Sequence, residues 1–350
     1  MTLERLRADI DRIDARILSL LEERMEKAIL TRRLKPGTRD PAREAEILAR
    51  VAARSRCLAR EEFTTALYGS ILAESRAIQD ASPRLVGFQG THGAYSESAV
   101  RAWDPAAAAI PFPEFGQVFD GVRNGSLDFG VVPVENTLGG IVGQVNSILV
   151  TTELRVVAAV DLPVAHCLLV APGQDHREIR TAYSHPQALA QCRRFLERNK
   201  LDPVEHFDTA GAARMIAEDR PKGAAAIAGR FAAELYGLEI IKEGIQDAQN
   251  NRTRFFVLSR EAPEAGGNKC SAVFFTDDKA GALFRVLEVF ARSGINLTRI
   301  ESVPNEPGDY AIFLDFEGSD RDPGVARAVS EASALARDFR MLGCYTEARL

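Results

Sequence analysis

Several features that mark membrane, secreted or nucleic-acid-binding proteins are missing from this sequence. No apolar run approaches the roughly 20 residues that a membrane helix needs, and charged residues interrupt the first twenty positions, where a signal peptide would be apolar. The net charge is -5, whereas nucleic-acid-binding domains are normally basic. The five cysteines show neither C-x-x-C pairs nor metal-ligand spacing. We therefore expect a cytoplasmic protein with buried, reduced thiols and with no metal, membrane or nucleic-acid partner.

The spacing of apolar residues changes along the chain and divides it into three segments. Over residues 3–34 apolar residues recur at alternating steps of three and four, which predicts one long amphipathic helix. Two shorter helices follow, one from Asp40-Pro41 and one over residues 61–79. Beyond Pro83 short apolar runs alternate with helical stretches, which is typical of an α/β sheet domain. The apolar runs cover residues 85–88, 128–134, 155–160, 167–170 and 224–228.

The last segment has the element order β-α-β-β-α-β, which predicts a small ferredoxin-like unit that ends in a strand near residues 341–345. The stretch "APEAGGN", residues 262–268, is typical of a linker. A chain of 350 residues also exceeds what a single core usually holds. We therefore predict a multidomain fold with an all-helical domain at residues 1–82, an α/β domain at residues 84–260 and an α+β ferredoxin-like domain at residues 268–350.

The first helix is too long for its two companions to cover. About 32 residues span roughly 48 Å, whereas each shorter helix has only about 18 residues. We therefore expect a second protomer to cover the remaining apolar stripe, which gives a homodimer or a higher homo-oligomer.

Cations and polar groups occupy helix faces that should be apolar. Arg24 lies in the apolar stripe of the first helix, and Lys35 has nearly the same helical phase. On the third helix Ser75 and Gln79 continue an apolar row that begins at Leu67. A snorkelling side chain or a salt bridge explains each cation alone. Because unpaired buried cations are costly, the set as a whole indicates a pocket for a small dianion.

The helical segment resembles the all-helical chorismate mutase family over residues 3–79. The resemblance is carried by "LRADIDRID", "LLEERMEKA", "RDPARE" and "LAESRAIQ". It implies that Arg24, Arg43, Ser75 and the partner's Arg7 bind the substrate carboxylates, that Lys35 and Gln79 address the ether oxygen, and that Asp40 and Glu44 lie near the ring hydroxyl. The implied Claisen rearrangement needs no cofactor, only a folded substrate and a cation where charge develops.

Three loops of the central segment place a hydroxyl residue just before a helix, in "VVPVENTLGG", "AYSHPQALAQC" and "FDTAGAA". Helix capping explains each loop alone, but loops at the strand ends of an open α/β sheet are where ligands usually bind. With "QGTHGAYSE" and "NRTRF", these motifs resemble the prephenate dehydratase family over residues 84–260. The resemblance implies two α/β lobes with the site between them. It gives the principal catalytic role to Thr253, assisted by Glu135, Asn136, Thr137, Ser184, His185 and Gln191.

Thr253 stands between two arginines at the start of an apolar strand. The implied reaction expels the ring hydroxyl and carbon dioxide together, so the enzyme must give the departing hydroxyl a proton or a strong hydrogen bond. Because a threonine is a poor acid, we hypothesise that Glu135 or His185 is the proton source. We expect Arg252 and Arg254 to be solvated or to favour a dianion nearby. The same motifs also resemble arogenate dehydratases, but fusion to a mutase favours prephenate as the substrate.

Residues 269–345 resemble an ACT regulatory domain. The resemblance implies phenylalanine contacts in "GALF", "INLT" and "ESVP", at Gly281, Ala282, Leu283, Asn296, Leu297, Glu301 and Ser302. Val303 stands where phenylalanine-binding members commonly have arginine, so we expect the loss of that cation to affect ligand binding or coupling between domains. A domain that dimerises without a ligand is the alternative.

Together the resemblances imply a bifunctional enzyme of phenylalanine biosynthesis. It would rearrange chorismate to prephenate, then decarboxylate and dehydrate prephenate to phenylpyruvate, without any cofactor and under feedback control by phenylalanine. Two alternatives are a non-catalytic amino-acid-binding regulator and a chain in which only the dehydratase works while the helices dimerise.

Overall fold

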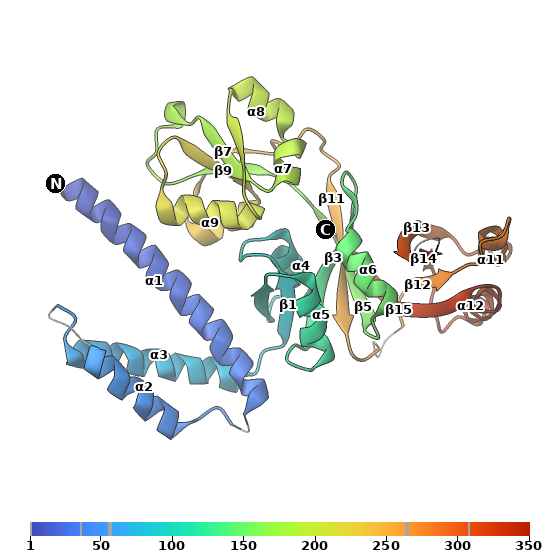
Figure 1. The fold of residues 1–350 in the computed structure, drawn as a ribbon, viewed down its shortest axis with the longest axis horizontal. Helices are drawn as coiled ribbons and strands as arrows, with labels where there is room; N and C mark the ends of the chain where they lie inside the picture. The colour runs from blue at the N-terminus through green and yellow to red at the C-terminus, as the bar shows by residue number, and fades with distance from the viewer. Residues whose placement is uncertain (1, 36, 55–57, 263–265, 307–308) are drawn as a thin grey trace. The chain divides into compact units, whose positions relative to one another are not determined.

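The computed structural model describes residues 2–35, 37–54, 58–262, 266–306 and 309–350. The chain divides into two compact units, Met1–Arg84 and Leu85–Leu350, which are coloured blue and cyan-to-red in Figure 1. Among the described residues, no helix combines the length and apolar character needed to cross a bilayer.

The first unit is all-helical, as the sequence predicts. Its elements are α1 (Leu3–Thr31), a 3-10 turn (Arg32–Leu34), α2 (Pro41–Arg54) and α3 (Glu61–Ala81). The Asp40 carboxylate accepts a hydrogen bond of 3.0 Å from the backbone N–H of Arg43, so it caps α2 as expected. On α3 the buried side chains are Ile71, Leu72, Ser75 and Gln79. Leu67, predicted to belong to this row, is instead exposed.

The apolar stripe of α1 remains open to solvent within its own unit. Leu3, Ile10, Ile13, Ile17 and Leu20 are 49% to 63% exposed, and the buried residue of α1 is Ile29, close to its C-terminal end. Within its own unit α1 is therefore packed at its C-terminal end and exposed along most of its length. An exposed apolar stripe of this kind is typical of an interaction surface.

The second unit begins with an α/β lobe, which we call the first lobe. Its strands are β1 (Leu85–Gln89), β2 (Ala108–Phe112), β3 (Phe129–Asn136), β4 (Gly140–Ile141), β5 (Arg155–Pro163) and β11 (Arg252–Ser259), with helices α4 (Tyr95–Trp103), α5 (Phe115–Arg123) and α6 (Gly143–Thr151). β11 lies antiparallel between β5 and β3, in the order β5-β11-β3-β1-β2. The strand that carries Thr253 is thus central in this sheet (Figure 1).

The chain leaves the first lobe after β5, forms a second α/β lobe and returns through β11. The second lobe has the strand order β10-β6-β9-β7-β8 within the described residues. Its strands are β6 (Cys167–Val170), β7 (Thr181–Ser184), β8 (Asp202–Glu205), β9 (Ala224–Ala228) and β10 (Glu239–Glu243), and its helices are α7 (Pro186–Gln191), α8 (Arg193–Asn199), α9 (Thr209–Asp219) and α10 (Arg230–Tyr236), with a 3-10 turn at His176–Glu178. The two-lobed α/β prediction is confirmed.

The C-terminal part has the predicted order β-α-β-β-α-β. Its elements are β12 (Lys269–Phe275), α11 (Ala282–Arg292), β13 (Leu297–Glu306), β14 (Asp309–Glu317), α12 (Pro323–Leu335) and β15 (Arg337–Arg349). Part of the expected linker, residues 263–265, falls outside the described residues.

The last strand is much longer than the sequence predicts. β15 pairs with β12 from Arg337 to Tyr345 and then, in parallel, with β5 of the first lobe from Thr346 to Arg349. The C-terminal sheet and the first-lobe sheet are therefore continuous through β15, in the order β13-β14-β12-β15-β5. Apolar periodicity does not reveal the partner of a strand, so this extension is not predictable from the local pattern.

Candidate active sites

A cavity of about 490 Å³ lies in the helical unit and is lined by residues of α1, α2, α3 and the α1–α2 loop. The predicted residues that line it are Arg24, Lys35, Asp40, Arg43, Glu44, Ser75 and Gln79. Arg7, predicted to come from a partner, is exposed near the start of α1 and does not line the cavity of its own chain. The residues predicted from the sequence thus form one coherent group of side chains around a common cavity.

Hydrogen bonds orient the polar groups of this cavity. Arg24 Nη1 donates to Ser75 Oγ at 2.6 Å, and that hydroxyl donates to the Ile71 carbonyl at 2.8 Å. Lys35 Nζ donates to the Thr38 carbonyl at 3.1 Å. Gln79 Oε1 is buried and has no hydrogen-bond partner among the described residues. A buried polar atom of this kind is suited to a polar ligand.

The cavity is strongly basic. Arg24, Lys27, Lys35, Arg43, Arg50 and Arg76 line it, against the carboxylates of Asp40 and Glu44. Sequence reasoning missed Arg76, which pairs with Glu44 at 2.7 Å, although its position beside Ser75 was a usable signal. Arg43 pairs with the half-exposed Glu46 at 2.6 Å, and this bond lowers the pKa of Glu46. An excess of cations in a concave site favours a substrate with more than one negative charge.

In the second unit Thr253 faces Asn136 across the β11–β3 pair. Asn136 Nδ2 lies 2.9 Å from Thr253 Oγ1, 2.7 Å from Asn251 Oδ1 and 3.0 Å from the Arg252 carbonyl. The Asn136 Oδ1 accepts from the backbone N–H groups of Leu138 at 3.0 Å and Gly139 at 2.7 Å, which fixes the amide orientation. Thr253 Oγ1 therefore accepts from Asn136, which leaves its own proton for another acceptor.

The Thr137 hydroxyl forms hydrogen bonds with the backbone beside Thr253. Its hydroxyl donates to the Asn250 carbonyl at 2.9 Å and accepts from the Arg252 N–H at 2.9 Å. Both functions of the hydroxyl are used to hold the backbone directly before Thr253. These bonds tie Thr137 to the backbone beside Thr253, and its predicted substrate contact stays a prediction.

A chain of hydrogen bonds joins Asn136 to the second lobe. Asn251 Nδ2 donates to Gln191 Oε1 at 3.0 Å, and the same oxygen lies 2.9 Å from His166 Nε2. His166 Nδ1 lies 3.1 Å from the Tyr95 hydroxyl. Burial lowers the pKa of His166, against an opposing effect of its bond to Gln191. Sequence reasoning missed His166, Asn251 and Tyr95, although Tyr95 lies within the motif "QGTHGAYSE" and Asn251 stands two residues before Thr253.

The two predicted residues before α7 differ in their exposure. Ser184 is fully buried and its hydroxyl donates to the Ile227 carbonyl at 2.6 Å, so the structure commits this group to the second-lobe sheet and not to an open site. His185 caps α7, with Nδ1 accepting from the Gln187 N–H at 3.2 Å. The start of α7 approaches the loop after β3, because a Cβ added to Gly139 would lie 2.0 Å from Gln187 Nε2.

Glu135 does not join Thr253. Side chains alternate between the two faces of a strand, and Glu135 pairs with Arg254 whereas Asn136 pairs with Thr253. The Glu135 carboxylate lies 3.2 Å from Arg254 and 3.5 Å from Arg299. The structure therefore removes Glu135 as the direct proton source for a group at Thr253.

The flanking arginines are paired within the fold, so the expectation that they are solvated is wrong, whereas the alternative that they favour a nearby dianion stays a prediction. Arg254 is 6% exposed and surrounded by carboxylates. Arg252 is paired with Asp161 at 2.9 Å and is largely shielded. Their positive charges are used within the fold on either side of Thr253.

The motif "QGTHGAYSE" connects the lobes. Thr91 donates to Asp208 through both its N–H, at 3.1 Å, and its hydroxyl, at 2.7 Å. Glu97 is buried and accepts from His92 at 3.0 Å and Arg101 at 3.0 Å. Burial opposes the charge of Glu97, but these bonds outweigh it and lower its pKa. The motif thus holds the first lobe against the start of α9, where Asp208 is the N-cap.

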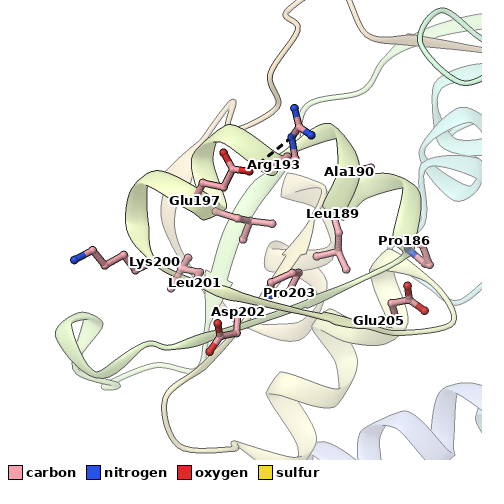
Figure 2. Close-up of a pocket in the computed structure, with 11 residues that line it drawn as sticks. Pro186, Leu189, Ala190, Arg193, Glu197, Lys200, Leu201, Asp202, Pro203 and Glu205 are labelled. Carbon is pink, nitrogen blue, oxygen red and sulfur yellow. Dashed lines mark ion pairs between the residues drawn. The ribbon is translucent and has the colours of Figure 1, made fainter.

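A second cavity, of about 620 Å³, lies on the second lobe between α7, α8 and β8 (Figure 2). Leu189, Leu196 and Leu201 are among the apolar residues that line it, together with the charged residues Lys200 and Asp202. None of the predicted site residues lines this cavity, so we do not assign either reaction to it. Within the described residues, no group of three or more His, Cys, Asp or Glu side chains has the geometry of a metal site.

The predicted phenylalanine contacts fall into two places in the C-terminal part. Gly281, Ala282 and Leu283 form the start of α11, with Gly281 at φ +81°. Asn296 precedes β13, and Leu297, Glu301 and Ser302 lie along it. Val303 is buried. Sequence reasoning missed two buried charges of this region, Asp315 and Arg299. The Arg299 Nη2 donates to Asn146 Oδ1 of α6 at 2.8 Å.

Three protein families match successive parts of the chain. Chorismate mutase type II matches residues 6–80, prephenate dehydratase matches residues 86–263, and the ACT domain matches residues 271–333.

Individual relatives span either the whole chain or its last three quarters. The bifunctional chorismate mutase/prephenate dehydratase of Neisseria gonorrhoeae is 33% identical over 97% of this chain and 96% of its own length. The arogenate dehydratase/prephenate dehydratase 2 of Arabidopsis thaliana is 39% identical over 77% of this chain and 75% of its own length. The prephenate dehydratase of Arthrobacter aurescens, solved in complex with L-Phe, is 32% identical over 75% of this chain and 90% of that chain, with a TM-score of 0.70.

Proposed function

The chain belongs to the family of bifunctional chorismate mutase/prephenate dehydratases, and from this premise we propose how its residues divide the two reactions. The enzyme rearranges chorismate to prephenate, then decarboxylates and dehydrates prephenate to phenylpyruvate. Its ACT domain is regulatory, with phenylalanine as the ligand, as in the L-Phe complex of the Arthrobacter relative. A non-catalytic regulator is therefore excluded. The domain boundaries given from the sequence and the cytoplasmic location stay predictions.

For the mutase reaction we propose that the basic cavity of the helical unit binds the chorismate dianion. Arg24 and Arg43, with the partner's Arg7, hold the carboxylates. Lys35 and Gln79 address the ether oxygen, where negative charge develops as the bond breaks. Asp40 and Glu44 lie near the ring hydroxyl, and Ser75 orients Arg24 at 2.6 Å. No group needs to take or give a proton, since the rearrangement is intramolecular.

The site requires a second protomer in this proposal. The exposed stripe of α1 and the position of Arg7 outside its own cavity both support a homodimer in which α1 crosses to the partner. Covering this stripe removes several large apolar side chains from water, each contributing about 1.5 to 3 kcal/mol on full burial.

For the dehydratase reaction we propose that Thr253 donates a hydrogen bond to the departing ring hydroxyl. The observation that carries this is the fixed amide of Asn136, which donates to Thr253 Oγ1 at 2.9 Å and so leaves the threonine proton for another acceptor. Loss of the hydroxyl as water and of the carboxylate as carbon dioxide leaves an aromatic ring. With Glu135 turned to the other face of the sheet, His185 is the remaining candidate proton source.

The substrate of the second reaction is open to one alternative. The Arabidopsis relative is named for both arogenate and prephenate, and the two substrates differ in an amino or a keto side chain. We propose prephenate, because the helical unit matches a mutase family and the Neisseria relative spans both units. The Gln191 amide oxygen already accepts a hydrogen bond from Asn251, so its N–H2 group is left to donate to the keto side chain of prephenate.

The experiment gives the purified protein chorismate, prephenate and arogenate separately, with and without phenylalanine, and identifies the products. Thr253→Ala is expected to lower dehydratase kcat by roughly 100-fold or more, in the range of a lost general-acid contribution, while chorismate is still converted to prephenate. Thr253→Ser, which keeps the hydroxyl, is the matched control and should retain most of the activity. Normal dehydratase turnover by Thr253→Ala would remove the threonine from the mechanism.

A further inference from the structure

A cluster of buried charges lies on the face of the β11–β3 pair opposite Thr253. Arg254 and Glu135 face each other there, because they are the neighbours of Thr253 and Asn136 along the two strands. Arg254 Nη1 lies 3.2 Å from Glu135 Oε1. The residues adjacent to both groups of the proposed dehydratase pair therefore contact each other on the far side of the sheet.

The C-terminal domain provides the other members of this cluster. Asp315 of β14 forms a close ion pair with Arg254, and Glu347 of β15 lies 2.5 Å from Arg254 Nε. The Tyr345 hydroxyl accepts from Arg254 Nη2 at 2.7 Å. Arg299 of β13 reaches Glu135 at 3.5 Å. The first lobe thus contributes one cation and one acid, and the remaining charges come from a different domain.

The charges balance but are costly to bury. Arg254, Arg299 and Lys269 stand against Glu135, Asp315 and Glu347, and Arg254, Arg299 and Asp315 are almost completely shielded from solvent. Burial opposes the charge of Arg254, but Tyr345 and the two carboxylates outweigh it and raise its pKa. Apolar side chains of similar volume stabilise such a position at least as well. Stability alone is therefore a weak explanation for the cluster.

The strand pairing indicates a further role for the cluster. The register of β11 against β3 shifts directly after the Arg254–Glu135 pair, where Phe255 pairs with Pro133. A shift of this kind is a bulge, which re-aims neighbouring side chains and is common next to active sites. Pro133 has no N–H to donate to the ladder. The regular strand pairing is thus shifted next to Thr253, and the Arg254–Glu135 ion pair links the two strands at that point.

We infer that Arg254 is a positioning residue of the dehydratase site, held by Asp315 of the C-terminal domain so that Thr253 and Asn136 keep their alignment. This inference depends on the proposed role of Thr253. Arg254 does not touch the substrate, because its side chain points to the opposite face of the sheet. The C-terminal domain therefore completes the dehydratase site mechanically, in addition to any ligand that it binds.

The test compares single and paired substitutions in the full-length chain. Asp315→Asn is expected to lower dehydratase kcat by roughly 10- to 100-fold, the scale of a small misplacement of a catalytic group, with little change in KM. Asp309→Asn is the matched control on the same strand, since the Asp309 pair with Arg337 at 2.6 Å is half-exposed and remote from Thr253. Mutase activity of each variant, measured on chorismate, reports on the helical unit and should not change.

A paired variant separates positioning from stability. Arg254→Met with Asp315→Leu replaces the central ion pair by apolar groups and leaves Glu135 with Arg299 and Glu347 with Lys269. We expect thermal stability close to that of the wild type and a dehydratase kcat that stays low. Recovery of kcat together with stability would show that the cluster is only structural and would overturn the inference. If Thr253→Ala is inactive while Asp315→Asn is normal, the inference fails and the proposed site stands; if Thr253→Ala is active, the proposed site itself fails.

Discussion

His166 lies 2.9 Å from Gln191 and is 2% exposed, so its protonation state affects the hydrogen-bond chain to Asn136. Burial lowers its pKa below the ordinary value of 6.5. The unfolded chain therefore binds a proton at a higher pH than the folded chain does. Neutral His166 therefore stabilises the folded chain fully above pH 6.5. This stabilisation decreases as the pH falls from 6.5 to the pKa that His166 has in the folded state.

We predict that the His166→Gln variant loses less free energy of unfolding than the wild type as the pH falls below 6.5. Glutamine keeps a donor toward Gln191 but cannot be protonated in this range, and a tenfold difference in proton affinity between the folded and unfolded chains corresponds to about 1.4 kcal/mol. The measurement is chemical unfolding at pH 5 to 8, followed by the fluorescence of Trp103, the single tryptophan, which lies in the second unit. The other histidines are present in both proteins and cancel in the difference. Parallel profiles for the wild type and the variant would contradict the prediction.

At single positions the sequence predicted which residues gather, but not which way they face. Glu135 and Asn136 stand in one motif, although the period of two along a strand requires them to point to opposite faces. The alternation along the strand is therefore enough to place these two side chains on opposite faces, although the motif was treated as one group of site residues. Ser184 and Thr137 are different: their hydroxyls are committed to the Ile227 and Asn250 carbonyls, and no local pattern predicts such long-range backbone partners.

Among the elements, most strands with an apolar run were predicted, whereas the apolar edge strand β2 and the polar edge strand β8 were missed. β6 and β9 begin and end where the apolar runs do. β8 is the edge strand of its sheet, and all four of its residues are exposed, so it lacks the alternation that identifies a half-buried strand. The length of β15 escaped prediction for another reason, because its last residues, Thr346 to Arg349, pair with β5, which lies far away in the sequence.

Gly343 marks the place where β15 passes from its own domain to the first lobe. A Cβ at this position would lie 2.0 Å from the Val156 carbonyl oxygen of β5. Since that atom belongs to a backbone in the middle of a sheet, it cannot move aside as a flexible side chain does.

We predict that Gly343→Ala separates β15 from β5 and destabilises the second unit by about 1 to 3 kcal/mol, the usual cost of overpacking. Unfolding monitored by Trp103 measures the change. Gly116→Ala is the control, because a Cβ on this α5 residue meets no atom within 4 Å and should be neutral or stabilise by up to about 1 kcal/mol. An equal effect of the two substitutions would show that β15 does not pack as closely as the structure indicates.

For the whole molecule, the two reactions occupy separate compact units, Met1–Arg84 and Leu85–Leu350. The domain order follows from the change of apolar rhythm along the chain, which is why it was predictable. The charged cluster around Arg254 was not, because each of its members reads as an ordinary surface charge in the sequence. Only the continuous sheet through β15 brings them together.

The proposed dimer predicts that two inactive variants recover mutase activity when their protomers combine in one dimer. If each mutase cavity uses its own Arg24 and the partner's Arg7, then Arg7→Ala and Arg24→Ala homodimers are both inactive as mutases. A mixed dimer of the two variants has one site that lacks both arginines and one that is intact. Random exchange of subunits should therefore restore about one quarter of the wild-type mutase activity, since half of the dimers are mixed and half of their sites are complete.

The measurement is chorismate turnover after the two inactive variants are unfolded and refolded together, with each variant refolded alone as the control. Arg24→Ala mixed with Lys35→Ala is the matched negative control if both groups come from the same chain as the cavity, as their shared lining indicates. In that mixture every site lacks one cation, so no recovery is expected. Absence of recovery in the Arg7 mixture would show that Arg7 and Arg24 act from the same chain, and an active Arg7→Ala homodimer would show that Arg7 is not needed; either result would overturn the shared site. Recovery in the Arg7 mixture alone requires a cavity completed by a second copy, which also accounts for the exposed stripe of α1.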